Sequence, residues 1–364
     1  MGHDNSEVRV LIAASGTGGH LFPAVEIARA LQRRHSPLRV EFVGSGRPLE
    51  AVIVGGAGFK RHEISTVGIK QRGVRGLFEF LRTLPFALAQ TWRLLSHLRP
   101  HLVVGVGGYV SVIPVTLARL RGIPTWIHEA ERRPGMANSC LARYASRISL
   151  AFPDAVVPCR RKAVYTGQPV RRIFQEIAAE ENARVHPEHL LVTGGSQGAR
   201  TLDEAMLALI PMLRKHGMKV RHQSRKENVE RLRAAYVREG LEAEVMDFIS
   251  DLPGCYRWCD LVLSRAGAGT TMELGAVNRP AILVPYPHAQ GNHQLHNARV
   301  LADAGKAVIV EEGEGFNERL AAALAGLLDD AAYRRMRETP FRSRSLDAAD
   351  AIADGCLKLA VRRA

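Results

Sequence analysis

The sequence predicts an α/β protein with two doubly wound domains in tandem, and three observations support this prediction. Short β-branched runs alternate with longer helical patterns along the chain, which is typical of parallel sheets with helices on both faces. Each half opens with a strand, a glycine-rich loop and a helix, at LIAASGTGGH from Leu11 and at LLVTGGSQGAR from Leu190. A chain of 364 residues also exceeds what one hydrophobic core usually fills.

Runs rich in Val, Ile and Leu locate the strands of both halves. In the first half, strands are expected at residues 8–15, 38–46, 101–108, 123–128 and 147–152, and a helix through Ala24 to Arg34 follows the first of them. In the second half, strands are expected at residues 189–195, 218–224, 243–249, 260–267, 280–286 and 306–312.

A Gly, a Pro and then a charged segment separate the two sets of strands after Thr166. We therefore expect one domain at residues 1–168 and a second at residues 169–344, with a C-terminal helix at 345–364 packed back on the first domain. Ligands of open α/β sheets bind at the carboxyl ends of the strands, so the loops of both domains are expected to face one cleft.

The charge of the chain indicates an anionic partner. The formal net charge is +14, which favours nucleic acid, acidic lipid or a phosphorylated substrate. The chain has no zinc-finger spacing and no RRM signature, and only 6% of it is aromatic, so we expect no nucleic-acid partner. The five cysteines are scattered without a CxxC, which indicates a reducing cytoplasm. No apolar run approaches the roughly 18 residues of a membrane span, so a soluble or peripheral protein is expected.

Three glycine loops are candidate phosphate sites: SGTGGH at residues 15–20, GVGGYVS at 105–111 and TGGSQGAR at 193–200. Glycines between a strand and a helix let backbone N–H groups approach a phosphate, although the same pattern also makes a plain tight turn. A dinucleotide fingerprint would have a third glycine where Leu21 stands, and no loop ends in the Lys of a P-loop. The loops therefore favour phosphate binding of another kind.

His20 is the candidate general base. It follows two glycines and is expected in the first turn of a helix. A helix N-terminus disfavours the imidazolium, so the pKa of His20 should lie below the usual value of about 6.5 and leave a neutral base near pH 7. The alternative, a histidine that only caps the helix or bonds to the loop, is the commoner role of a lone histidine.

Arg265 and Glu273 are candidate ligand residues of the second half. Arg265 stands at a strand end, where its positive charge can bind a phosphate. Glu273 follows in the next helix, where a carboxylate can accept hydrogen bonds from both hydroxyls of a ribose. Complementing the helix dipole is the alternative role of Glu273. Neutral groups able to bind sugar hydroxyls cluster after the next strand, at His288, His293, Gln294 and Asn297. No acid or cysteine completes a metal-ligand set with these histidines, so no metal is expected.

The motifs GTGGH, GGYVS, HE, GxPVR, GGSQGAR, HQS, FI, SRAGAxTxxE and NHQxxNA occur in this order between residues 15 and 298. Their order resembles the MurG family, the lipid II synthase glycosyltransferases, over essentially the whole chain. The resemblance implies a GT-B architecture, which is two Rossmann-like doubly wound domains facing a cleft. It also implies an inverting transfer of GlcNAc from UDP-GlcNAc to the C4 hydroxyl of undecaprenyl-pyrophosphoryl-MurNAc-pentapeptide, which converts lipid I to lipid II in peptidoglycan synthesis. No cofactor is implied.

The resemblance further implies a role for each matching residue. The second domain would bind UDP-GlcNAc through Gly195, Ser196 and Gln197 at the diphosphate, Arg171 at the phosphates, Ile249 at the uracil, Glu273 at the ribose, and His293 and Gln294 at the sugar. Arg265 and Ala268 belong to the SRAGA motif of the same donor site. In the first domain Thr17, Gly18, Gly19, His20 and Tyr109 would face the diphosphate of the undecaprenyl-linked acceptor.

The segment HEAERRPGMAN, which begins at His128, departs from the family pattern. Glu129 falls where the family has a Glu, and we expect it to act with His20 by positioning substrate hydroxyls. Ala130 and Glu131 replace the usual Gln and Asn, so Glu131 either faces the donor sugar or pairs with a neighbouring arginine. Gln168, Asp203 and Arg225 are further departures. A paralogue with another sugar or lipid and a UDP-sugar-binding protein without transferase activity therefore remain alternatives.

Residues 68–100 mix basic and apolar side chains. Lys70, Arg72, Arg75, Phe78, Arg82, Phe86 and Trp92 would let this stretch rest on the anionic inner leaflet without spanning it. Packing of its apolar residues into the domain core is the alternative, and Pro85 is expected to break the helical pattern. The expected location is the cytoplasmic face of the bacterial inner membrane, as a peripheral protein.

Overall fold

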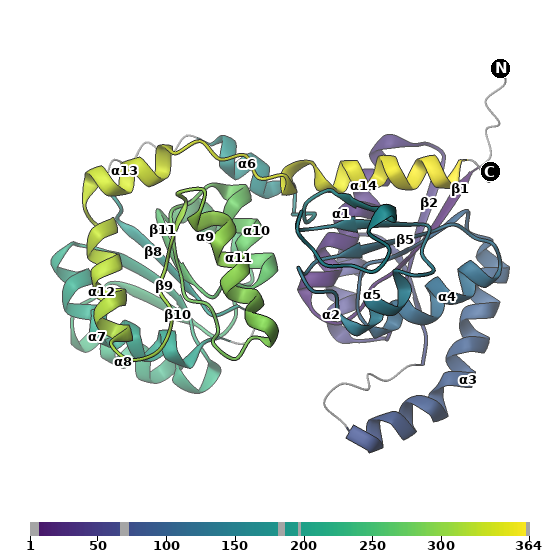
Figure 1. The fold of residues 1–364 in the computed structure, drawn as a ribbon. Coiled ribbons are helices and arrows are strands. Elements are labelled where there is room, and N and C mark those ends of the chain that lie inside the picture. The colour runs from purple at the N-terminus through teal and green to yellow at the C-terminus, as the bar shows by residue number, and fades with distance from the viewer. Residues whose placement is uncertain (1–6, 66–72, 181–185, 196–197, 362–364) are drawn as a thin grey trace. The chain divides into compact units, whose positions relative to one another are not determined.

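The computed structural model describes residues 7–65, 73–180, 186–195 and 198–361, and for residues 73–81 and Gln290 it describes the backbone only. The chain forms two compact units. Unit 1 contains the chain up to Arg171 and again from Arg344 onward, and unit 2 is Arg172–Ser343 (Figure 1). Unit 2 is thus inserted into the sequence of unit 1. The domain boundary expected after residue 168 lies just before the observed boundary at Arg171.

Unit 1 is built on a parallel sheet whose seven described strands have the order β3-β2-β1-β4-β5-β6-β7. The strands are β1 (Val8–Ala13), β2 (Leu38–Gly44), β3 (Lys60–Glu63), β4 (Leu102–Gly105), β5 (Thr125–Glu129), β6 (Arg147–Leu150) and β7 (Ala163–Tyr165). The helices are α1 (Gly18–Arg34), α2 (Pro48–Glu50), α3 (Gly73–Leu98), α4 (Val112–Leu120), α5 (Met136–Leu141) and α14 (Ser345–Ala360).

The sequence did not predict β3 and β7, which are the two edges of this sheet. Their sequences are KRHE and AVY, and neither is an apolar run. An edge strand pairs on one side only and can be short and charged, because it does not cross the buried middle of the sheet. The hydrophobic signal that located the central strands is therefore weak at the edges.

Helix α3 continues through Pro85, so the expectation that this proline breaks the helix was wrong. Proline removes one i→i−4 hydrogen bond and leaves the carbonyl of residue 81 without its helical donor. Pro85 is exposed, and water can reach this side of the helix. The local loss is therefore small compared with the bonds retained along the 26 residues of α3.

The C-terminal helix α14 completes the core of unit 1. Ile352 and Cys356 are fully buried in the same apolar cluster as the central strands. Three arginine–aspartate ion pairs join α14 to α1 at the edge of this contact. Gly355 lies against Trp126, and a Cβ atom there would be 2.3 Å from the indole ring. Glycine is thus required for α14 to approach the sheet this closely.

Unit 2 repeats the design with a parallel sheet whose six described strands have the order β10-β9-β8-β11-β12-β13. The strands are β8 (His189–Thr193), β9 (Lys219–Gln223), β10 (Ala243–Met246), β11 (Leu261–Ser264), β12 (Ala281–Leu283) and β13 (Ala307–Ile309). The helices are α6 (Ile173–Ala179), α7 (Arg200–Lys215), α8 (Val229–Arg238), α9 (Leu252–Trp258), α10 (Ala268–Val277), α11 (His293–Ala302), α12 (Phe316–Leu327) and α13 (Asp330–Glu338).

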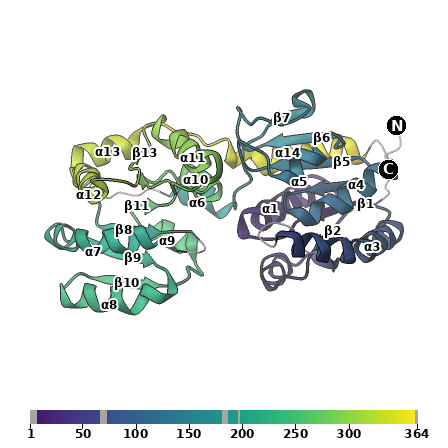
Figure 2. The ribbon, with the colours of Figure 1, turned by 60° about the horizontal axis from the view of Figure 1, so that its bottom comes forward.

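Helices lie on both faces of each sheet (Figure 2), and the order of the strands reverses once in each. In unit 1 the reversal falls between the neighbours β1 and β4, and in unit 2 between β8 and β11. Ligands of doubly wound sheets bind at such switch points, outside the carboxyl ends of the strands. The loops that follow three of these strands, β1, β4 and β8, contain the glycine motifs expected to bind phosphate.

Candidate active site

The two glycine loops of unit 1 meet at its switch point. The parallel ladder of β1 and β4 continues past both strands, because Val106 N donates to the Ala13 carbonyl at 3.0 Å. Gly107 and Gly108 both have positive φ, at 84° and 77°. A Cβ atom on Gly108 would lie 3.2 Å from the Ser15 carbonyl oxygen. Glycine is needed here both for the backbone conformation and for the close approach of the two loops.

His20 lies in the first turn of α1, as predicted. A Cβ atom on Gly107 would be 2.5 Å from His20 Cδ2, so the imidazole packs against the backbone of the second loop. Burial lowers the pKa of His20. The direction agrees with the prediction, and its cause is burial. Within the described ranges, His20 Nδ1 is buried without a hydrogen-bond partner.

The other expected acceptor residues lie at the same edge of the sheet. Thr17 is exposed at the N-cap of α1, and Gly18 and Gly19 begin the helix. Tyr109 is half-buried and follows directly on the second loop. These residues and His20 therefore come from the two adjacent loops that end β1 and β4.

Glu129 is buried at the end of β5 and holds its own loop. Its Oε1 accepts from Glu131 N at 2.8 Å, and its Oε2 accepts from Asn138 Nδ2 at 2.9 Å. Burial raises the pKa of Glu129 to about 7, against the opposing effect of these hydrogen bonds. Both carboxyl oxygens thus bind the HEAERRPGMAN segment, and a direct contact with substrate hydroxyls stays a prediction.

The remainder of this segment is anchored by Arg132. Its Nε lies 3.1 Å from Asp154 Oδ1, and its guanidinium lies over the Phe152 ring at 5.5 Å. Glu131 is half-buried. Its expected contact with the donor sugar stays a prediction.

The pKa of Glu129 predicts a pH dependence of stability. Because the folded pKa of about 7 exceeds the ordinary 4.5, the folded state holds a proton that the unfolded state has lost between these values. The free energy of unfolding should therefore fall as pH rises from about 4.5 to 7. Glu129→Gln should flatten this part of the curve, since Asn138 Oδ1 has no partner in the described chain and can turn toward the new amide. Urea unfolding across this range measures the slope.

The control for this variant is Glu230→Gln, at an exposed carboxylate of α8. It should leave the slope as in the unmodified protein. An equal slope in the protein and in Glu129→Gln would contradict the role of burial at Glu129.

In unit 2 hydrogen bonds from the ends of β8 and β9 hold the loop after β8. Gln223 Oε1 accepts from Thr193 Oγ1 at 3.1 Å and from Gly194 N at 3.2 Å, and Thr193 Oγ1 accepts from Gly195 N at 3.2 Å. Gly195 has a φ of 77°. Ser196 and Gln197, expected at the diphosphate, lie outside the described residues. Gln223 was missed as a functional residue, although the HQS motif contains it.

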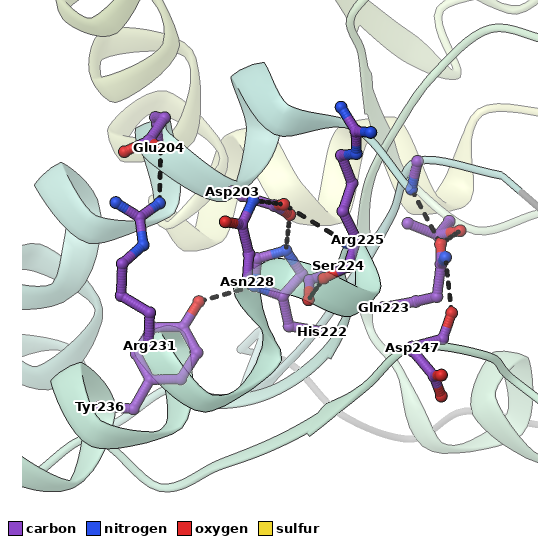
Figure 3. A network of polar contacts seen from close by, with 12 residues as sticks. Asp203, Glu204, His222, Gln223, Ser224, Arg225, Asn228, Arg231, Tyr236 and Asp247 are labelled. Carbon is purple, nitrogen blue, oxygen red and sulfur yellow. Dashed lines mark hydrogen bonds and ion pairs between the residues drawn. The ribbon is translucent and has the colours of Figure 1, made fainter. Parts of the chain in front are cut away.

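A buried polar network lies behind this loop (Figure 3). Asp203 Oδ2 accepts from Asn228 Nδ2 at 2.7 Å and from Arg225 N at 3.3 Å. His222 Nε2 is 3.2 Å from Asp203 Oδ1, an ion-pair distance without hydrogen-bond geometry, and His222 Nδ1 is 2.8 Å from Tyr236 Oη. Two departures from the family pattern, Asp203 and Arg225, thus contact each other and fix the end of β9 behind the loop.

A cavity of about 460 Å³ lies beside the TGGSQGAR loop. It is lined by Arg200, Thr201 and Glu204 at the start of α7 and by residues between Gly313 and Glu318 at the start of α12. Helix starts present free N–H groups and the positive end of the helix dipole. Glu204 and Glu318 also line the cavity, so two acidic side chains oppose the positive helix ends and Arg200 there.

The loop after β11 contains Arg265, which is buried and contacts other residues of the protein. Its Nη1 lies 2.5 Å from Glu312 Oε1 and donates to the Val284 carbonyl at 3.2 Å. Its guanidinium lies over the Tyr286 ring at 5.5 Å. Much of its positive charge is therefore balanced by Glu312, and the expected contact with phosphate stays a prediction.

Ala268 is the first residue of α10, and Glu273 follows in the second turn. The helix dipole acts mainly on the first turn, so complementing it is a weak explanation for Glu273. Glu273 is half-buried, which leaves part of its surface available to a ligand. The position fits the expected contact with ribose, which stays a prediction.

The expected sugar-binding cluster is divided by burial. His293 and Gln294 begin α11 and are half-buried, and Gln294 Oε1 accepts from Tyr286 N at 2.9 Å. Asn297 is fully buried, and its Nδ2 donates to the Ala266 carbonyl at 3.1 Å and so fixes the loop after β11. Its expected contact with sugar hydroxyls stays a prediction.

Ile249 and Arg171 complete the expected donor residues. Ile249 is half-buried in the loop after β10, at the same edge of the sheet as the loops after β8 and β11. Arg171 belongs to unit 1 and not to the second domain, because its guanidinium stacks on the Phe22 ring of α1 at 4.7 Å. Among the described residues no group of His, Cys, Asp and Glu side chains is placed to hold a metal ion.

Comparison with known proteins agrees with this arrangement. Residues 10–150 match the glycosyltransferase family 28 N-terminal domain, and residues 189–352 match the glycosyltransferase family 28 C-terminal domain. The solved structure of Acinetobacter baumannii MurG superposes with a TM-score of 0.72 and 29% identity, covering 96% of this chain and 99% of that one. The predicted fold class, two parallel α/β sheets of the GT-B type, is confirmed.

Curated relatives are similar over nearly their full length. A protein of Anaeromyxobacter sp. (strain K) is 40% identical over 361 residues, which cover 98% of this chain and 94% of the relative. A protein of Nitratidesulfovibrio vulgaris (strain DSM 19637 / Miyazaki F) is 40% identical over 374 residues, covering 95% and 96%. Both are named UDP-N-acetylglucosamine--N-acetylmuramyl-(pentapeptide) pyrophosphoryl-undecaprenol N-acetylglucosamine transferase. The chain belongs to the MurG family, within glycosyltransferase family 28.

Proposed function

We propose that this protein transfers N-acetylglucosamine from UDP-GlcNAc to undecaprenyl-pyrophosphoryl-MurNAc-pentapeptide and so makes lipid II for peptidoglycan. The observation that carries the proposal is the 40% identity, across 98% of this chain, to a relative whose name states that activity. The glycine loops at both switch points support it, because each offers backbone N–H groups to one of the two diphosphates.

Unit 2 is the proposed donor site. The TGGSQGAR loop and the start of α7 receive the diphosphate, Ile249 the uracil, Glu273 the ribose, and His293 and Gln294 the sugar. The start of α7 supports this assignment, because its free N–H groups and positive helix end directly follow the TGGSQGAR loop. Gln223 and Asp203 keep the loop in place and do not themselves reach the ligand in this proposal.

Glu273→Ala should raise the KM for UDP-GlcNAc more than it lowers kcat. The carboxylate would bind the ribose in the ground state and the transition state alike, and loss of such uniform binding appears in KM. Steady-state kinetics of UDP release, with lipid I held saturating, measure both constants. The matched control is Glu230→Ala, an exposed glutamate in the first turn of α8. An unchanged KM in Glu273→Ala would rule out the ribose role.

Unit 1 is the proposed acceptor site. His20 accepts the proton of the C4 hydroxyl as the oxygen forms its bond to C1 of the sugar, while the bond from C1 to the UDP oxygen breaks. This single displacement inverts the configuration at C1. The charge that develops on UDP is stabilised by the N–H groups of the donor loop and the helix starts behind it. No step of this mechanism needs a metal ion.

The test of the proposed function is a donor panel. Purified protein is given lipid I with UDP-GlcNAc, UDP-GalNAc or UDP-glucose, and release of UDP is followed with His20→Ala as the background control. UDP-GlcNAc should give the highest kcat/KM. Preference for another donor would favour the paralogue suggested by Ala130 and Glu131. UDP binding without turnover of any donor would favour the non-catalytic alternative.

We also propose that unit 1 meets the membrane through α3, as a peripheral protein at the cytoplasmic face of the inner membrane. Phe86 and Trp92 are 68% and 52% exposed on this helix, and Arg82 is exposed beside them. Lys70 and Arg72 lie outside the described residues, and the side chains of Arg75 and Phe78 are not described. Each helix in the described ranges is too short or too polar to cross a membrane.

The double variant Phe86→Ser/Trp92→Ser should weaken binding to anionic vesicles by about tenfold or more, because burial of a large apolar side chain contributes roughly 1.5–3 kcal/mol. Co-sedimentation with phosphatidylglycerol vesicles measures the partition. Val237→Ser, at a site in unit 2 that is 79% exposed, is the control. Equal binding of the double variant and the control would remove α3 from the membrane contact.

A further inference from the structure

We propose that Gln168 is a positioning residue for His20. It ties the Gly19–His20 peptide to a buried chain of hydrogen bonds that runs from Trp126 through Ser149 and His128. We call this chain the Trp126 relay. The inference rests on the proposed transferase activity, in which His20 is the base, but its closing test does not need turnover.

The starting point is Pro23 inside α1. Proline has no N–H, so the i→i−4 hydrogen bond that would end on the Gly19 carbonyl cannot form. This carbonyl belongs to the peptide that precedes the Cα atom of His20. Gln168 Nε2 donates to it at 3.5 Å, a long hydrogen bond from a residue 149 positions away. The side chain of Gln168 thus supplies the donor that Pro23 removes.

The relay has one consistent direction. A carbonyl only accepts, so Gln168 must present its amide N–H₂ to Gly19 and its Oε1 to His128 Nε2, which lies 2.7 Å away. His128 must then donate through Nε2. The Nδ1 atom of His128 then accepts from the Ser149 hydroxyl, whose Oγ lies 3.0 Å away. The other acceptor within reach of this hydroxyl is the Ile127 carbonyl, which is farther, at 3.4 Å.

Trp126 starts the relay, because its Nε1–H can only donate and lies 2.9 Å from Ser149 Oγ. Trp126, Ser149, His128 and Gln168 are all buried. Hydrogen bonds are stronger in such surroundings, and loss of one member leaves its neighbours unsatisfied away from water. The indole itself is held by α14 at Gly355. The Gly19 carbonyl is therefore tied to the rigid centre of unit 1.

In the described part of the chain, the ring of His20 lacks one of the hydrogen bonds that could fix its position. Its Nδ1 has no hydrogen-bond partner among the residues described, and its other face rests on the backbone of Gly107. The titratable group that faces it is His128, and burial lowers the pKa of His128 to about 4, so His128 is neutral when His20 titrates. The position of the imidazole therefore depends on the backbone at Gly19, which Gln168 holds.

Gln168→Met tests this inference, because methionine has a similar length and neither donates nor accepts as the amide does. We expect kcat to fall by about tenfold or more with the affinity for UDP unchanged, since transition-state contacts are lost and donor binding in unit 2 is not. Gln168→Asn keeps the amide on a shorter side chain and should retain more activity than Gln168→Met. Gln32→Met, an exposed glutamine of α1, is the control.

A second variant tests the relay at its other end. Ser149→Ala should lower kcat less than Gln168→Met does, and the double variant should be no worse than Gln168→Met alone, because both act through one path. Full additivity of the two effects would contradict a shared path. Thermal melts of every variant separate a loss of kcat from a loss of folded protein.

The closing experiment is an NMR titration of the His20 ring, assigned with His20→Ala. In the unmodified protein burial holds the pKa of His20 below 6.5. Gln168→Met should move it up toward 6.5, because the freed loop exposes the imidazole to water. An unchanged His20 pKa in the folded variant would overturn the inference. Absence of UDP release by the unmodified protein would overturn the proposed function alone, since the titration does not depend on catalysis.

Discussion

His20→Ala should lower kcat by roughly 10²–10⁴-fold, the effect expected when a general base is removed. The imidazole stands where the loops after β1 and β4 meet, and its pKa is lowered by burial. It is therefore neutral near pH 7 and able to accept a proton. Because donor binding is assigned to unit 2, the KM for UDP-GlcNAc should change little.

Two measurements make this prediction specific. The acid limb of the kcat profile should lie below about pH 6.5 in the unmodified protein and be absent from the residual activity of His20→Ala. His216→Ala, at an exposed histidine at the end of α7, should leave both kcat and the profile unchanged. Near-normal kcat in His20→Ala would remove this residue from the mechanism.

Arg265→Ala should lower the free energy of unfolding of unit 2 by about 3 kcal/mol, because it leaves a buried carboxylate without its partner. The side chains of Arg265 and Glu312 are only 10% and 18% exposed, so water cannot replace the lost ion pair well. The double variant Arg265→Ala/Glu312→Ala removes both charges and should recover part of this loss. A double variant that recovers stability but not activity would favour the phosphate role of Arg265.

Urea unfolding followed by tryptophan fluorescence measures this effect, with Trp258 as the reporter in unit 2. The matched control is Arg257→Ala, which breaks an ion pair with Glu180 whose side chains are 41% and 48% exposed. Such exposed pairs contribute about 0–1 kcal/mol. Equal losses in the two variants would show that burial of Arg265 does not matter.

The fold could be predicted because its main signals are local in the sequence. An apolar strand, a glycine loop and a helix lie within about a dozen residues, and this unit occurs at the start of both halves. The edge strands β3 and β7 give no such signal, because a charged strand like KRHE needs only one paired side. Helix α3 shows the opposite error. Pro85 is a strong local signal for a helix end, but the exposed helix accommodates the proline and continues.

The site could be located but not completed from the sequence. His20 and Glu273 could be proposed because motifs place them next to strand ends. The residues that hold the loops have partners far along the chain: His128 with Gln168, Asp203 with Asn228, and Asn297 with Ala266. No local pattern reveals such pairs, because they arise only when the sheet brings the strand ends together. Glu129 differs from these, because its partners, the backbone of Glu131 and the amide of Asn138, lie in its own loop, and its contact with substrate hydroxyls stays a prediction.

The return of the chain at Arg344 has a consequence for synthesis on the ribosome. Unit 2 ends at Ser343, so all of its strands and helices have been made before α14 exists. Unit 1 begins first but lacks Ile352 and Cys356 in its core until α14 has been made. The apolar cluster of unit 1 is therefore still open after the whole of unit 2 has been synthesised, and only the addition of α14 covers it.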